Sequence, residues 1–254
     1  MEALVVKDLS KNFGGVNAVQ NVCFEVEAGE HLAIIGPNGA GKTTLFNLLS
    51  GQLTPTAGRV IFFGQDITDL PTHYRIHLGM SRSFQIASLF LKLSVLQNIR
   101  LALQGIRPSR FQMFRSADSY KNVITKAEEL LRSMDLWEKR NVLVNAISYG
   151  EQRKLEIALS LATEPKLLLL DEPSSGLTAD ESADITGRIR NLGTKITVVL
   201  VAHDMDLVFG VAQRIIVLHY GELIIDGPCD KVRTDPKVKE IYMGTAKIGG
   251  KCLS

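Results

Sequence analysis

The residues with the clearest chemical potential form a glycine-rich run that ends in lysine and threonine. The run matches G-x-x-x-x-G-K-[ST] at every fixed position. Its glycines allow several backbone N–H groups to point at one anion, Lys42 can add charge near the β- and γ-phosphates, and the Thr43 hydroxyl can hold Mg²⁺. The pattern predicts a phosphate-binding loop for a nucleotide. The residues expected to line it are Gly36, Pro37, Asn38, Gly39, Ala40, Gly41, Lys42, Thr43 and Thr44.

Two carboxylates follow a fully apolar run at residues 167–170, which is typical of a buried strand. Ligands of such sheets bind at the carboxyl ends of the strands. Asp171 could hold Mg²⁺ through water, and Glu172 could polarise an attacking water as a general base. His203 stands at the end of another apolar run. It is either a structural histidine or a third polar group at the same edge.

A second helix start carries residues with anion-binding potential. Ser148 and Glu151 have the spacing of a capping box. The cap does not explain Gly150, because glycine inside a helix costs about 1 kcal/mol relative to alanine. A helix N-terminus with serine and glycine can also bind an anion, and both interpretations can hold together.

In this combination and order, the motifs resemble those of the ATP-binding subunits of ABC transporters. The resemblance covers nearly the whole chain and implies an ATPase that uses ATP and Mg²⁺. It implies that Phe13 stacks on adenine and that Gln85 contacts Mg²⁺ and the attacking water. It also makes Glu172 the catalytic base and His203 a switch residue near the γ-phosphate. The implied catalytic set is Glu172, His203, Gln85 and Lys42, and the implied metal set is Thr43, Gln85 and Asp171.

The same resemblance implies partners. Two ATPase subunits, either identical or related, pair head to tail, and each ATP lies between one phosphate loop and the signature of the other subunit. Transmembrane permease subunits bind this pair, and a solute-binding protein acts with it indirectly. The chain would then be cytoplasmic and peripheral on the inner face of the cytoplasmic membrane. The signature residues are Ser148, Tyr149, Gly150 and Glu151.

Departures from the family pattern indicate which subgroup of the family this chain resembles. Tyr149 replaces a glycine, Glu151 a glutamine, and Thr178 an aspartate that couples the two subunits. Ser148-Tyr149-Gly150, residues 153–158 and residues 203–208 resemble the branched-chain amino-acid importers, as does the tail at 235–244. We therefore expect import of branched-chain or related amino acids. A lipopolysaccharide-export ATPase, which has a similar tail, and a soluble ABC-type ATPase of iron–sulfur cluster assembly remain alternatives.

The elements that must position these residues predict an α/β fold. Strand-like runs near residues 3–8, 22–26 and 59–63 suggest an antiparallel β subdomain. Uniformly apolar runs at 167–170 and 197–201 alternate with helical patterns, which favours a parallel sheet covered on both faces. We expect a P-loop NTPase (RecA-like) core, residues 1–84 and 162–254, with an inserted helical subdomain at 85–161, all within one domain spanning 1–254.

Composition argues against several other classes of protein. The chain has 254 residues, and its net charge of +2 gives no strong electrostatic case for nucleic-acid binding. Three distant cysteines show no metal spacing and indicate a reducing compartment. No signal peptide or membrane-spanning run is visible. The arginines at 107–115 are either solvated or contact lipid or nucleic acid. The apolar residues Ile86, Leu89, Phe90 and Leu93 either pack in the core or form a groove for a helix of a membrane partner.

Overall fold

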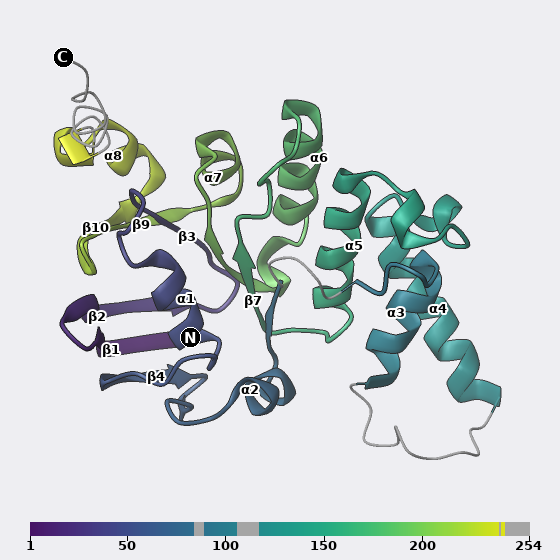
Figure 1. Ribbon diagram of the computed structural model, residues 1–254, viewed down its shortest axis with the longest axis horizontal. Helices are drawn as coiled ribbons and strands as arrows, with labels where there is room; N and C mark the ends of the chain where they lie inside the picture. The colour runs from purple at the N-terminus through teal and green to yellow at the C-terminus, as the bar shows by residue number, and fades with distance from the viewer. Residues whose placement is uncertain (84–88, 106–116, 239, 242–254) are drawn as a thin grey trace.

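The computed structural model describes residues 1–83, 89–105, 117–238 and 240–241. These residues form two β-sheets with helix α1 (Lys42–Leu49) between them (Figure 1). The first sheet is antiparallel, with strand order β2-β1-β4-β5. Its strands are β1 (Glu2–Phe13), β2 (Val16–Glu27), β4 (Ala57–Phe62) and β5 (Gln65–Asp66).

The polar motifs follow the carboxyl ends of strands in the second sheet. Its order is β10-β9-β3-β8-β7-β6, with every neighbouring pair parallel except β10 with β9. This confirms the predicted parallel sheet. The strands are β3 (His31–Ile35), β6 (Met80–Arg82), β7 (Leu167–Asp171), β8 (Thr197–Val201), β9 (Arg214–His219) and β10 (Glu222–Pro228).

The central strands are apolar on both faces because both faces are covered. Every residue of β3, β7 and β8 is buried. Leu32 and Ile34 pack in the core that contains α1, whereas Ala33 and Ile35 pack in the core on the opposite side of the sheet. Successive side chains of a strand point to opposite faces, so a continuous apolar run satisfies both layers.

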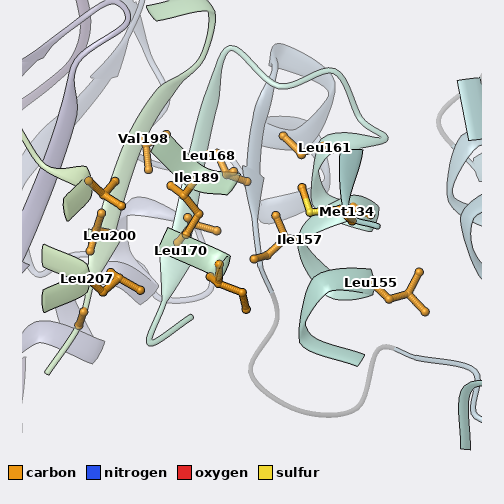
Figure 2. Packing of buried hydrophobic residues seen from close by; sticks show 14 of the residues in the cluster. Met134, Leu155, Ile157, Leu161, Leu168, Leu170, Ile189, Val198, Leu200 and Leu207 are labelled. Carbon is orange, nitrogen blue, oxygen red and sulfur yellow. The ribbon is translucent and has the colours of Figure 1, made fainter. Parts of the chain in front are cut away.

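Helices α6 (Ala179–Arg190) and α7 (Met205–Val211) cover the face opposite α1 (Figure 1). Leu168 and Leu170 of β7 and Val198 and Leu200 of β8 lie in the same buried cluster as Ile189 of α6 (Figure 2). The helical patterns expected to alternate with the apolar strands are confirmed by these two helices. Two further short helices are α2 (Thr72–Leu78) and α8 (Cys229–Thr234).

A group of helices lies beside the β7 and β6 edge of the sheet (Figure 1). Leu155, Ile157 and Leu161 of α5 belong to the same buried cluster as Met134, which follows α4 (Figure 2). The predicted helical character of this region is confirmed for the described residues, whereas the division of the chain at residues 84/85 and 161/162 stays a prediction. The elements are α3 (Val95–Gly105), α4 (Ala117–Ser133), the 3₁₀ turns Trp137–Lys139 and Val144–Ala146, and α5 (Tyr149–Leu161).

Sequence patterns did not predict every element. Strand β6 is only three residues long and contains Ser81 and Arg82, so it carries no apolar run. Helix α2 follows Pro71 and buries only Arg75, so it has no apolar stripe. Among the helices in the described part of the chain, none combines the length and the apolarity needed to cross a bilayer.

Candidate functional site

The phosphate loop joins the end of β3 to the start of α1, as predicted. Its glycines meet different demands. A Cβ atom on Gly36 would lie 2.3 Å from the Leu218 carbonyl oxygen, and one on Gly41 would lie 2.3 Å from that of Ala18. Gly39 has open space around it but a φ of +80°. Two glycines therefore allow close backbone approach, and the third supplies a left-handed turn.

Neighbouring strands hold the loop in place. The Gly221 N–H, in the turn between β9 and β10, donates to the Ala40 carbonyl at 3.0 Å. The Gln20 N–H of β2 donates to the Gly221 carbonyl at 2.8 Å, and its side-chain amide donates to the Tyr220 carbonyl at 3.0 Å. The loop is thus tied to both sheets, so its donors are preorganised before any ligand arrives.

Lys42 brings a buried positive charge to the start of α1. Its Nζ donates to the carbonyl oxygens of Gly36 at 2.6 Å and Pro37 at 3.0 Å, and the residue is 6% exposed. Burial lowers the pKa of Lys42, while the carboxylates of Glu172 and Asp171 act in the opposite direction. The first N–H groups of a helix have no acceptor within it, so the start of α1 offers donors as well as charge to an anion.

A cleft of about 650 Å³ opens over the loop. Its size, its polar donors and the lysine fit a nucleoside triphosphate. Phe13, half-exposed with the Lys11 ammonium 5.3 Å from its ring centre, is not among the described residues that line this cleft. Tyr220 is among them, and sequence analysis did not single it out as a site residue. The lining residues are Gly15, Val16, Asn17, Ala18, Gln20, Asn38, Gly39, Ala40, Gly41, Lys42, Thr43, Thr44, Glu172, His203 and Tyr220.

Glu172 and His203 meet across this cleft. The His203 Nε2 lies 3.0 Å from the Glu172 Oε1, and both residues line the cleft with Lys42 and Thr43. Glu172 has a φ of +47°, which is rare for a residue with a side chain. Its N–H donates to the Val201 carbonyl at 2.8 Å, which ties it to β8. The structure therefore brings two predicted catalytic side chains to the mouth of the phosphate loop.

Asp171 is buried, 2% exposed, and does not line the cleft directly. Its Oδ2 accepts a hydrogen bond from Arg82 at 2.7 Å. Arg82 also donates to Asn47, Ser50 and Gln52, at 2.7, 2.9 and 3.0 Å. Sequence analysis missed Arg82. The strand that carries it has no apolar run, and its pairing with the acidic strand exists only in the folded sheet.

The oxygen donors present suit a hard cation such as Mg²⁺. The Thr43 hydroxyl lies in the cleft, and the Asp171 charge is close enough to raise the pKa of Lys42 against burial. Hydroxyl and carboxylate oxygens are the ligands that Mg²⁺ prefers. Gln85, the third predicted metal ligand, lies outside the described residues, as do Ile86 and the arginines at 107–115.

The predicted capping box at the start of α5 is present. The Glu151 N–H donates to the Ser148 Oγ at 3.2 Å, and the Ser148 N–H donates to the Glu151 Oε2 at 2.9 Å. Burial works against ionisation of Glu151, but Lys139 and the Ser148 N–H outweigh it and lower its pKa. Tyr149 is half-exposed. None of these signature residues is among the described residues that line the cleft over the phosphate loop.

Packing against α6 explains why glycine occupies position 150, which the cap alone did not explain. A Cβ atom on Gly150 would lie 2.4 Å from the Glu181 Oε1 of α6. That carboxylate is held by the Thr178 N–H, which donates to the Glu181 Oε2 at 3.0 Å. Thr178, where the family pattern has aspartate, is the N-cap of α6. The signature helix and α6 therefore pack in direct contact.

The chain is similar to known proteins both in sequence and in fold. The family model described as ABC transporter matches residues 19–175. The "High-affinity branched-chain amino acid transport ATP-binding protein BraF" of Pseudomonas aeruginosa is 36% identical over 250 residues, covering 96% of this chain and 98% of BraF. The ADP-conformation structure of MJ1267, "an ATP-binding cassette of an ABC transporter", aligns with a TM-score of 0.84 at 30% identity, covering 96% and 99% of the two chains. The dimeric structure of the cassette MJ0796 bound to ADP and Pi aligns with a TM-score of 0.75 at 26% identity, covering 89% and 98%.

Proposed function

The chain belongs to the ABC transporter family as an ATP-binding, ATP-hydrolysing subunit, and from that premise we propose that it powers import of branched-chain or related amino acids. The similarity to BraF supports this substrate class because it extends over nearly the full length of both chains. The same similarity does not favour the two alternatives, lipopolysaccharide export and iron–sulfur cluster assembly. The observation that carries the ATPase activity is the meeting of Lys42, Thr43, Glu172 and His203 at one cleft, whereas the similarity to BraF carries the substrate class.

In this proposal the phosphate loop and Lys42 bind the phosphates of ATP. Glu172 orients the attacking water and accepts its proton, and His203 keeps the Glu172 carboxylate directed at the cleft while contacting the γ-phosphate. Phe13 and the signature residues complete the nucleotide site. Thr43, Asp171 and Gln85 would hold Mg²⁺, which when bound offsets the charge on the phosphates.

We infer that the working unit is a pair of ATPase subunits, either two copies of this chain or this chain with a relative. The position of the Ser148 helix start supports this inference, because a helix start that does not line the cleft of its own chain can serve a nucleotide in the partner. The dimeric state in which MJ0796 was solved supports it as well.

We propose further that the pair sits on the cytoplasmic face of the membrane, bound to permease subunits and served by a solute-binding protein. We also propose that residues 1–84 and 162–254 form the nucleotide-binding core and that residues 85–161 form an inserted helical subdomain. The name of BraF as a transport protein supports this setting.

Uptake in the native cell tests the proposal. Loss of the gene should abolish high-affinity uptake of radiolabelled leucine, isoleucine and valine. The wild-type chain should restore uptake, and Glu172→Gln should not. Tagged protein extracted with detergent should carry polytopic membrane proteins. Undiminished amino-acid uptake without the gene, or recovery with soluble partners alone, would contradict the proposal.

A further inference from the structure

Arg153 lies on α5, one turn beyond the signature, and it points away from that anion site into the protein. It is 6% exposed. Its Nη2 donates to the Glu172 carbonyl oxygen at 2.8 Å, and its Nε donates to the Pro173 carbonyl at 3.3 Å. A side chain of the signature helix thus holds the backbone of the segment that carries the proposed base.

A buried carboxylate fixes the orientation of the Arg153 guanidinium. Glu156, three residues further along α5 and 9% exposed, accepts from the Arg153 Nη1 at 2.6 Å. A buried ion pair costs more desolvation energy than it usually returns in stability. Stability alone therefore gives a poor reason for the Arg153–Glu156 pair. A positional role gives a better one, because the pair holds the planar guanidinium with its donors directed at the carbonyls of Glu172 and Pro173.

The residue that Arg153 holds is strained. Glu172 has a left-handed φ of +47°, a conformation that costs a non-glycine residue about 1–3 kcal/mol and persists only where the surroundings enforce it. Its N–H donates to the Val201 carbonyl, and its own carbonyl accepts from Arg153 at 2.8 Å and from the Ser175 N–H at 3.1 Å. The Ser175 bond closes a turn within the same loop, whereas the Arg153 bond fixes that loop to α5. Without Arg153 the turn is no longer held against α5, so Glu172 can relax and its carboxylate can move from the position proposed for the base.

We propose that Arg153 is a positioning residue that ties the Glu172 backbone to the signature helix. The proposal rests on the proposed function, in which Ser148 at the start of α5 contacts a nucleotide held by the partner subunit. Ser148 and Arg153 are roughly 7.5 Å apart along one helix axis. When α5 shifts as Ser148 engages that nucleotide, Arg153 moves with the helix and displaces the backbone of Glu172. Binding at one nucleotide site therefore changes the position of the proposed base at the other.

The test compares steady-state ATP hydrolysis by the full-length wild-type chain with that of four variants. Arg153→Met leaves the Glu156 charge buried and unpaired, so its Tm should fall. Arg153→Met/Glu156→Leu removes both charges and should recover most of that Tm. Both variants should lose about ten- to a hundredfold in kcat with KM for Mg·ATP unchanged. The Hill coefficient for ATP should fall toward one. Arg153→Lys, which retains one donor, should give an intermediate kcat.

Lys154→Met provides the matched control. Lys154 is the next residue on α5 and pairs with Asp184 of α6 at 2.5 Å, but it makes no hydrogen bond or ion pair to residues 172–173 among the described contacts. It should keep the wild-type kcat and Hill coefficient. A double variant with wild-type kcat, or an equal loss in Lys154→Met, would overturn the role of Arg153. Absence of turnover in the wild-type chain would instead contradict the proposed function.

Discussion

At the scale of single residues, the glycines of the phosphate loop do not all serve the ligand. Gly36 and Gly41 allow the loop to lie against the carbonyls of Leu218 and Ala18, while Gly39 provides a left-handed turn with open space beside it. The loop's shape therefore depends on β2 and β9 as much as on its own sequence. Substitution at the packed positions should disturb stability before any phosphate is bound.

Gly36→Ala tests this packing. The new Cβ would lie 2.3 Å from a backbone oxygen that cannot rotate away. We expect a loss of about 2–3 kcal/mol in the free energy of unfolding. Gly15→Ala is the control, because its Cβ would meet nothing within 4 Å and its φ is not in the left-handed region; it should change stability by less than about 0.5 kcal/mol. Urea denaturation measures both, and equal effects would contradict the packing argument.

Glu172→Gln tests the base. The amide preserves the shape of the side chain and its contact with His203 but cannot take a proton. Turnover should fall by about 10²- to 10⁴-fold while the dissociation constant for Mg·ATP stays within the range of the wild type. Equilibrium binding of a fluorescent ATP analogue and a phosphate-release assay measure the two quantities. Wild-type turnover in this variant would remove Glu172 from the role of base.

Site residues can be predicted from the sequence where they belong to a motif of neighbouring residues. Lys42, Thr43 and Glu172 follow from local spacing, and the structure brings all three to one cleft. Arg82 and Arg153 could not be found in this way. Their partners are far away in the sequence, so the bonds exist only after the sheet and α5 have packed.

At the scale of elements, the contact between α5 and α6 joins the signature to the segment after the acidic strand. Glu181 of α6 lies against Gly150, and the Tyr149 ring would be 3.1 Å from a Cβ on Gly176. Thr178 begins α6 by accepting from the Glu181 N–H, so the departure from the family's aspartate preserves a helix cap. The substitution is conservative for the start of the helix, because both residue types cap well.

Variants at Thr178 test the cap. Thr178→Ala removes the acceptor and should cost about 1 kcal/mol of unfolding free energy. Thr178→Asp supplies an equivalent acceptor and adds negative charge at a helix N-terminus, so stability should stay within about 0.5 kcal/mol of the wild type. Chemical denaturation of the three proteins measures the difference. An alanine variant as stable as the aspartate variant would show that the cap contributes nothing.

A charge cluster provides a second connection between α5 and α6. Asp184 pairs with Lys154 at 2.5 Å and with Arg188 at 2.9 Å, and Arg188 donates to the carbonyl of Ser133, the last residue of α4, at 2.7 Å. Burial opposes ionisation of Asp184, but the hydrogen bonds from Lys154 and Arg188 prevail and lower its pKa below the usual 3.8. The carboxylate therefore stabilises the folded state in its charged form.

Asp184→Asn should lower the unfolding free energy by about 1 kcal/mol at neutral pH, a modest effect because the side chain is partly exposed and screened. A folded-state pKa below the unfolded value gives stability that is present above the unfolded pKa. That stability is lost as the pH falls through the folded pKa. The difference between wild type and variant should therefore shrink from about pH 6 to about pH 3. Urea titrations across this range measure it, and a constant difference would contradict the assignment.

The elements themselves were predictable where burial imposed a pattern. Strands β7 and β8 are apolar along their whole length because both faces are covered, so the sequence indicated them directly. Strand β6 could not be found, since three residues with an arginine carry no periodic signal. It forms because β7 offers an edge, which is a property of the assembled sheet.

At the scale of the whole molecule, the two helix starts that we predict to bind phosphate lie at different places. The start of α1 opens into the cleft with Glu172 and His203, while the start of α5 belongs to the neighbouring helical group (Figure 1). In the proposed pair of subunits, each chain would supply its phosphate loop to one nucleotide and its Ser148 helix start to the other. A second subunit in reversed orientation would then bury a nucleotide at each junction.

Sedimentation velocity of Glu172→Gln with and without Mg·ATP tests this completion most directly. The account predicts monomers without nucleotide and dimers with Mg·ATP. Adding Ser148→Arg should leave ATP bound to the phosphate loop but prevent the dimer, because the new side chain fills the space at the helix start. Two results would contradict the claim that the Ser148 helix closes over a partner's nucleotide. One is that Glu172→Gln stays monomeric with ATP bound, and the other is that adding Ser148→Arg leaves the dimer fraction unchanged.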